Sequence, residues 1–182
     1  RLSSDYVRPK EDALIGGIPV DSEYIIFVID TSGSMVHYAW PAVVEKMTQV
    51  LDAYPRVKGL QIMNDMGQYM YSQYAGKWIP DTPGRRKAVI ARLRSWNVFS
   101  NSSPVEGITR AIRVFASRDH QISIYVFGDD FAGDLQTGES VALDVEAGDS
   151  FAFFLIADGA GLNDFDALGD GSFEFRDADG NY

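Results

Sequence analysis

The stretch that decides the fold is Tyr24–Met35, which reads YIIFVIDTSGSM. Its opening run, Tyr24–Ile29, is entirely apolar or aromatic, which is typical of a central strand covered on both faces. The run ends at Asp30, and two hydroxyls follow at Ser32 and Ser34. One carboxylate and two hydroxyls are therefore predicted at the carboxyl end of a central strand, where open α/β sheets bind their ligands.

Further strand-like and helical segments alternate along the chain, and this alternation predicts the fold class. Apolar residues at helical spacing predict helices that open at Pro41, Thr82-Pro83 and Pro104, since proline suits the first helical turn. The segments that read as strands are Val57–Met63, Gln68–Tyr74, Gln121–Phe127 and Phe151–Ala157. We expect an α/β fold: a Rossmann-like, doubly wound, mostly parallel sheet with helices on both faces.

The length indicates one globular domain. The chain has 182 residues, which is enough for one sizeable core and too few for two full-sized domains. We expect a lead-in at residues 1–21 that packs on a domain spanning residues 22–182, with a Gly- and Asp-rich segment at 158–182. Because the numbering begins at Arg1 rather than Met, we expect this domain to be one part of a larger chain or complex.

The amino-acid composition limits the kinds of site that the protein can contain and bears on its cellular location. Cysteine is absent, which excludes disulfides, zinc-thiolate sites and thiol catalysis. A cysteine-free chain suits an oxidising compartment, but such chains occur in the cytosol too. Of these locations, an extracellular, cell-surface or periplasmic one is favoured over the cytoplasm. The apolar runs are of strand length, well short of the roughly 18 residues of a membrane span, and we expect no direct membrane insertion.

Acidic residues are concentrated in the last part of the chain. The net charge is −10, and residues 129–182 hold 14 acidic side chains against one basic, whereas residues 1–128 hold 12 acidic against 15 basic. Nucleic acid is therefore not an expected partner. The basic residues between positions 85 and 94 are interpreted as a solvated helix face, with a docking face for an acidic partner as the alternative.

Oxygen-bearing side chains from separate loops can form one metal site. Hydroxyls and carboxylates are the hard oxygen ligands that Mg²⁺ prefers, and Asp30, Ser32 and Ser34 supply the first set. Asp129 and Asp130 come directly after a later predicted strand. Because carboxyl ends of parallel strands meet at one edge of a sheet, we expect these carboxylates beside the first set.

A serine-rich loop before the third predicted helix supplies further hydroxyls. Ser103 and Glu106 fit a capping box in which Ser103 is the N-cap. That leaves Ser102 as the better candidate for a metal ligand, with Ser103 as its rival. An ordinary polar turn is the alternative for the Asp30 loop, because Asp, Ser and Gly are common turn residues.

The segment Asp30-Thr-Ser-Gly-Ser-Met35 at the end of an apolar strand resembles the metal-ion-dependent adhesion site (MIDAS) of von Willebrand factor A (VWA) domains. Its residues are similar to those of bacterial members of the family. The resemblance covers roughly residues 22–160. It implies a divalent cation, Mg²⁺ or else Mn²⁺ or Ca²⁺, that binds an acidic side chain of a partner protein. It also implies protein recognition or cell adhesion rather than catalysis, so we do not expect an enzyme.

Carried over residue by residue, the resemblance implies that Asp30, Ser32 and Ser34 are metal ligands. It also implies that Asp129 is the aspartate that the family has after a later strand. Ser102, with Ser103 as its rival, stands where the family has threonine, and a serine side chain is less restrained in its rotamer. Asp130 stands where the family usually has glycine. It is therefore either an alternative ligand or a source of extra negative charge.

The loop Val36–Trp40 follows the first oxygen set and is expected at the rim of the site. Its His37, Tyr38 and Trp40 are predicted to face a partner, since aromatic residues are enriched at interaction hot spots. His37 has no second histidine or cysteine at ligand spacing, so it is interpreted as a rim residue or an accessory ligand. The alternative for all three is packing at the start of the first helix.

Two other functions fit parts of the pattern. The same fold can serve as an assembly or regulatory subunit, for example beside an ATPase of the AAA+ type, with a structural metal. A haloacid-dehalogenase-like (HAD) phosphatase would need an aspartate two residues after Asp30, where this chain has Ser32. The sequence contains no Ser/His/Asp triad pattern, P-loop or dinucleotide fingerprint.

Overall fold

The computed structural model describes residues 14–15, 18–96, 98–101, 104–117, 119–128 and 150–155, with the backbone alone for 14–15, 18–19 and 150–155. Its main sheet has five strands in the order β5-β4-β3-β6-β7. A separate two-stranded sheet pairs β1 (Leu14–Ile15) with β2 (Ile18–Pro19).

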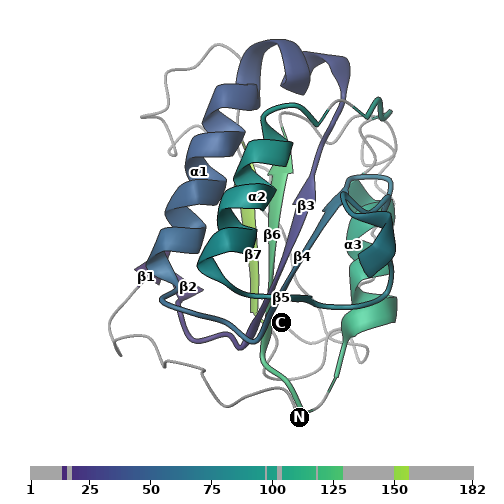
Figure 1. The fold of residues 1–182 in the computed structure, drawn as a ribbon. Helices are drawn as coiled ribbons and strands as arrows, with labels where there is room; N and C mark the ends of the chain where they lie inside the picture. Colours follow the sequence, from purple (N-terminus) through teal and green to yellow (C-terminus); the bar gives the residue numbers. More distant parts are fainter. Residues whose placement is uncertain are drawn as a thin grey trace.

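The central strand of the main sheet is β3 (Tyr24–Ile29), and all of its residues are buried. It lies between β4 (Gly59–Asn64) and β6 (Ile122–Gly128) and is parallel to both, and β6 is parallel to β7 (Ser150–Leu155). Among the described strands of this sheet, β5 (Ile79–Pro80) alone runs antiparallel, against β4. The expected mostly parallel α/β sheet is thus confirmed (Figure 1).

The register places the carboxyl ends of the three central strands side by side. Ile29 at the end of β3 pairs with Asn64 of β4 and with Phe127 of β6. The chain passes from β3 to β4 on one side and later returns to place β6 on the other side of β3. A switch of this kind opens a crevice at the carboxyl ends of the strands, so the residues that follow Ile29 lie where such sheets bind ligands.

Within the described ranges, three α-helices flank the sheet: α1 (Trp40–Ala53), α2 (Pro83–Leu93) and α3 (Pro104–Phe115). A short π-helix, η1 (Met35–Ala39), leads into α1. The predicted helix starts are confirmed to within one residue. At α2, the Thr82 hydroxyl caps the helix by accepting the N–H of Arg85 at 3.2 Å.

Alternate residues of β3 belong to two cores, one on each face of the sheet. The odd-numbered residues between Ile25 and Ile29 pack beneath α1 and α2, against buried side chains such as Met47. The even-numbered residues pack beneath α3, against Ile108 and its neighbours. Helices therefore cover both faces of β3 (Figure 1), which explains why the strand is apolar at every position.

The predicted strand at Gln68–Tyr74 is wrong. This segment pairs with the sheet through an isolated antiparallel bridge between Tyr69 and Met63. The chain then enters a 3-10 helix, η2 (Ser72–Tyr74). The edge strand is instead the two-residue β5, which is too short to produce a periodic pattern in the sequence.

The tyrosines of this segment stack against arginines of two helices. The guanidinium carbons lie 5.3 to 5.4 Å from the ring centroids, in the pairs Arg110–Tyr69, Arg92–Tyr71 and Arg85–Tyr74. These cation–π contacts hold the segment against α3 on one side and α2 on the other. The tyrosines of this segment are therefore held by helices rather than by sheet pairing.

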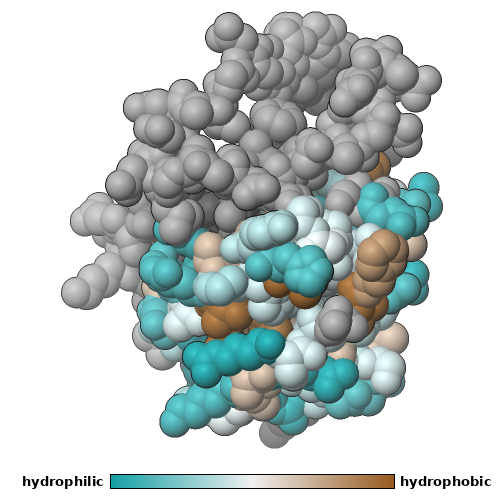
Figure 2. Space-filling view, turned by 90° about the horizontal axis from the view of Figure 1, so that it is seen from above, coloured by the Kyte–Doolittle hydropathy of each residue, from teal (hydrophilic) through white to brown (hydrophobic). Residues whose placement is uncertain are grey.

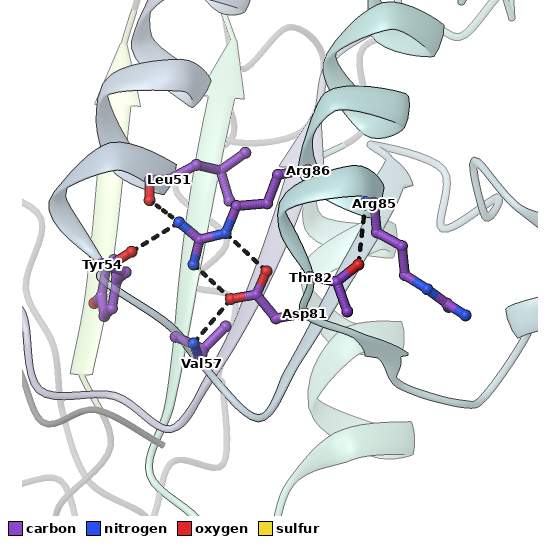
Figure 3. A network of polar contacts seen from close by, with 7 residues as sticks. All are labelled: Leu51, Tyr54, Val57, Asp81, Thr82, Arg85 and Arg86. Carbon is purple, nitrogen blue, oxygen red and sulfur yellow. Dashed lines mark hydrogen bonds and ion pairs between the residues drawn. The ribbon is translucent and has the colours of Figure 1, made fainter. Parts of the chain in front are cut away.

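Arg86 joins α2 to the end of α1 through a network of polar contacts (Figure 3). Its Nε donates to the buried carboxylate of Asp81 at 2.7 Å, and its Nη2 donates to the other oxygen of the same carboxylate. Its Nη1 donates to the carbonyls of Leu51 and Tyr54, and Asp81 also accepts the N–H of Val57 at 2.9 Å. For Arg86, the interpretation as part of a solvated basic face is therefore wrong.

Candidate metal centre

Asp30 lies directly after β3, at the carboxyl edge of the sheet. Its N–H donates to the carbonyl of Phe127 at 2.8 Å, which continues the pairing of β3 with β6 one residue past the end of β3. The residue is 1% exposed, and its Oδ1 accepts the N–H of Ser32 at 2.7 Å. This Asx turn fixes the loop that follows, as the polar-turn alternative also predicts. The buried carboxylate nevertheless stands at the switch point of the sheet.

The hydroxyls of Ser32 and Ser34 lie together at the start of this loop. Their oxygen atoms are 3.1 Å apart. Ser32 is buried and Ser34 is exposed, so the pair reaches from the interior to the solvent. Neighbouring ligands of an octahedral Mg²⁺ with bonds of 2.0–2.1 Å stand about 2.9 Å apart, and the observed spacing is close to that value.

A second loop reaches the same carboxylate through Ser100. The Ser100 side chain is buried, and its hydroxyl donates to Oδ1 of Asp30 at 3.5 Å, a long hydrogen bond. The serine-rich composition of this loop suggested that it lies near the first oxygen set, and Ser100 does contact Asp30. The pattern favoured Ser102, however, because a capping box accounts for its neighbour and nothing in the spacing singled out Ser100.

The remaining predicted ligands lie outside the described residues. They are Ser102, Ser103, Asp129 and Asp130. The structure describes the chain as far as Asn101 before the first pair and as far as Gly128, at the end of β6, before the second. The roles of these four side chains stay predictions.

A third loop carries Asp65, a fully buried carboxylate that the sequence pattern did not reveal. Its Oδ1 accepts the N–H of Thr31 at 3.3 Å and the Thr31 hydroxyl at 3.5 Å. Its own N–H donates to the carbonyl of Ile29 at 2.9 Å. In the sequence, Asp65 belongs to a turn-like Asn-Asp-Met-Gly stretch, and its position beside Thr31 follows from the register of β4 against β3.

The aromatic residues after the first loop divide into exposed and buried ones. His37 and Tyr38 are exposed as predicted, with Tyr38 at 74%, and their rings meet edge to face at 6.2 Å. Trp40 is buried, so the prediction that it faces a partner is wrong. Its indole N–H donates to the carbonyl of Leu93 at 2.9 Å, which ties the start of α1 to the end of α2.

Phe99 is a further exposed aromatic side chain, next in sequence to a residue of the candidate metal centre. It precedes Ser100 in the second loop and is 74% exposed. Seen from above, the described part of the surface shows hydrophobic patches between hydrophilic side chains (Figure 2). Phe99 sits in a stretch of mixed polarity, and exposure of a single phenylalanine cannot be read from such a pattern.

Within the described ranges, no three His, Cys, Asp or Glu side chains gather into a metal-binding group. Among the described residues, the donors at this edge include the carboxylate of Asp30 and the neighbouring hydroxyl oxygens of Ser32 and Ser34. In the same ranges, none of the helices combines the length and apolar character that crossing a membrane requires. Comparison of the chain with protein-family models, curated proteins and solved structures gives no match.

Proposed function

We propose that the chain is a VWA-type domain that binds a divalent cation at the carboxyl edge of its sheet and, through that cation, an acidic side chain of a partner protein. One observation carries the proposal: the hydroxyl oxygens of Ser32 and Ser34 lie 3.1 Å apart, beside the buried carboxylate of Asp30. Their place at the switch point of a mostly parallel α/β sheet supports it.

The chemistry of this donor set fits Mg²⁺ and, with longer bonds, Mn²⁺ or Ca²⁺. All three groups offer oxygen, which hard divalent cations prefer, and Mg²⁺ commonly keeps waters or a partner's oxygen in its shell. Because two of the three donors are neutral, the bound cation would retain positive charge toward an external carboxylate. Ser102 and Asp129 are the further ligands that we expect, with Ser103 and Asp130 as their alternatives.

Recognition fits the loop better than catalysis does. A phosphatase of the HAD type needs an acid two residues after its nucleophilic aspartate, and here that residue is Ser32. The N–H of Ser32 donates to Asp30 instead, so the carboxylate serves to shape the loop. An aryl phosphate assay with Mg²⁺ tests this directly, since turnover that Asp30→Asn abolishes would make the protein an enzyme.

Calorimetric titration of Mg²⁺, Mn²⁺ and Ca²⁺ into metal-stripped protein tests the cation site. We expect saturable one-to-one binding that Asp30→Ala abolishes and that Ser32→Ala weakens. Asp52→Ala is the matched control, because Asp52 is an exposed carboxylate on α1 and should not affect binding. Wild-type protein that takes up no cation would overturn the proposal.

The partner is tested with a peptide that carries one central glutamate and a matched peptide that carries glutamine. We expect the glutamate peptide to bind with Mg²⁺ and to be released by a chelator, and the glutamine peptide to bind far more weakly. Binding of a protein partner that neither chelator nor Asp30→Ala affects would instead favour an assembly or regulatory subunit with a structural metal.

A further inference from the structure

Asp65 makes contacts in two directions from the end of β4. Toward β3, its carboxylate oxygen Oδ1 accepts both the N–H and the hydroxyl of Thr31, the residue between Asp30 and Ser32. Its N–H also donates to the carbonyl of Ile29, which extends the pairing of the two strands. The segment from Ile29 to Ser32 is thereby bound to the loop after β4 at two residues, Ile29 and Thr31.

Toward α3, the backbone carbonyl of Asp65 accepts the N–H of Gly107 at 2.6 Å. The approach is close because Gly107 has no side chain: a Cβ at this position would lie 2.7 Å from the carbonyl oxygen of Asp65 and 2.8 Å from that of Asn64. Gly107 belongs to the first turn of α3, which follows the loop that carries Ser100. Asp65 therefore connects the loop after β3 to the start of α3.

We propose that Asp65 is a positioning residue for the cation site, which holds Thr31 and so fixes the loop of Asp30 and Ser32 against the start of α3. The inference rests on the proposed function, because it concerns the same site. A carboxylate forms stronger hydrogen bonds to N–H and O–H donors than a neutral oxygen does. Mutation of the partners that orient metal ligands typically lowers metal affinity by about 10- to 100-fold.

The first arm of the test compares Mg²⁺ affinity in three variants with that of the wild type. Asp65→Ala removes the acceptor, and we expect a loss of about 10- to 100-fold. Asp65→Asn keeps an acceptor oxygen without the charge, and we expect affinity within a few-fold of wild type. Asp81→Asn is the control, because Asp81 is also a buried aspartate that accepts a backbone N–H, but it lies in the Arg86 network.

The second arm needs no metal. Hydrogen exchange of the Thr31 amide, followed by NMR, should accelerate about five- to tenfold in Asp65→Ala, the factor that loss of one hydrogen bond of typical net strength produces. In Asp81→Asn the exchange of this amide should remain as in the wild type. A residue that acts by general stability alone would not show this selectivity.

Each outcome separates the inference from the proposed function. Equal losses of Mg²⁺ affinity in Asp65→Asn and Asp65→Ala would mean that the charge acts on the cation, and would overturn positioning through Thr31. A comparable loss in Asp81→Asn, or full affinity in Asp65→Ala, would overturn it too. If the wild type binds no Mg²⁺, the proposed function fails, and Thr31 exchange alone then decides whether Asp65 holds the loop.

Discussion

The parallel strands begin along one side of the sheet, the amino edge, and end along the opposite side, the carboxyl edge. Both sides bury carboxylates, but the groups around these carboxylates differ. At the amino edge, where Pro80 of β5 pairs with the first residue of β4, Asp81 forms a two-point ion pair with Arg86. At the carboxyl edge, Asp30 and Asp65 accept hydrogen bonds from backbone N–H and hydroxyl groups of the adjacent loops. A guanidinium cancels the charge of a carboxylate, whereas a hydrogen bond from a neutral N–H or O–H group does not.

From this difference we predict that the amino edge serves stability and the carboxyl edge serves binding. The ion pair at the amino edge also satisfies the carbonyls of Leu51 and Tyr54 at the end of α1, so it closes the structure there. The donors at the carboxyl edge shape loops around an oxygen-rich centre. If this division holds, substitutions at one edge should change stability and substitutions at the other should change cation binding.

The largest effect is expected from Arg86→Met at the amino edge. The variant leaves the buried carboxylate of Asp81 without its guanidinium, so we expect the free energy of unfolding to fall by about 3 kcal/mol in urea denaturation. Mg²⁺ affinity of the folded variant should match the wild type. Lys87→Met, at the exposed neighbouring position, is the control. An equal loss in Lys87→Met, or lost Mg²⁺ binding in the folded Arg86 variant, would contradict the division between edges.

A second comparison sets Gly107→Ala against Gly84→Ala. A Cβ at Gly107 would meet two backbone carbonyls at 2.7 and 2.8 Å, so we expect a loss of about 1–3 kcal/mol and weaker Mg²⁺ binding as α3 shifts from Asp65. A Cβ at Gly84 meets nothing within 4 Å, so alanine should stabilise α2 by up to about 1 kcal/mol. Similar urea curves for the two variants would refute the close approach at Gly107.

The buried hydroxyls of Tyr54 and Tyr125 form a further polar contact between the end of α1 and the sheet. They lie 2.8 Å apart, and removing either one deprives the other of this partner. We expect Tyr54→Phe and Tyr125→Phe each to lower the free energy of unfolding by about 1–2 kcal/mol. The double variant should lose less than the sum of the two, because no hydroxyl is then left behind. Strict additivity would show that the two hydroxyls do not act as a pair.

The same pair predicts a loss of stability in alkali. Burial raises the pKa of the Tyr125 hydroxyl above its ordinary value of 10.0, and the adjacent Tyr54 raises it further. Above about pH 10 the unfolded chain therefore releases a proton that the folded chain keeps, and the stability present below that pH is lost by up to about 1.4 kcal/mol per pH unit. Tyr125→Phe should reduce the difference in unfolding free energy between pH 9 and pH 11. An unchanged difference would mean that other groups dominate.

The smallest effect on stability is expected at the exposed aromatic residues. Tyr38 and Phe99 are each 74% exposed, so Tyr38→Ala and Phe99→Ala should change the free energy of unfolding by less than about 0.5 kcal/mol. If the carboxyl edge receives a partner, both variants should weaken binding of that partner at unchanged Mg²⁺ affinity. Their Mg²⁺ titrations therefore serve as the control for their peptide binding.

Long periodic segments made the fold class predictable from the sequence. The apolar run of β3 covers six residues, and the helices that begin near Pro41 and Pro83 cover 14 and 11 residues. The edge strand β5 was missed because two residues carry no period. The strand prediction for Gln68–Tyr74 was wrong because the tyrosines of this segment stack against arginines of α2 and α3.

The candidate site was predictable only where its chemistry is local. Asp30, Ser32 and Ser34 follow one another at intervals of two residues, and their proximity follows from a single loop. Asp65 and Ser100 reach this loop through strand register and helix packing, which a sequence does not display. Residues brought in from distant loops are thus the part of such a site that requires a structure.

The short antiparallel strand β5 has a consequence for self-assembly. A sheet edge with free backbone groups invites another chain to pair with it, and such pairing leads to fibres and aggregates. Here the edge beside β4 is finished by two residues, and the second is Pro80, which has no N–H to offer an incoming strand. Many copies of this domain could be crowded together, for instance on a surface, without this edge serving as a template for sheet extension.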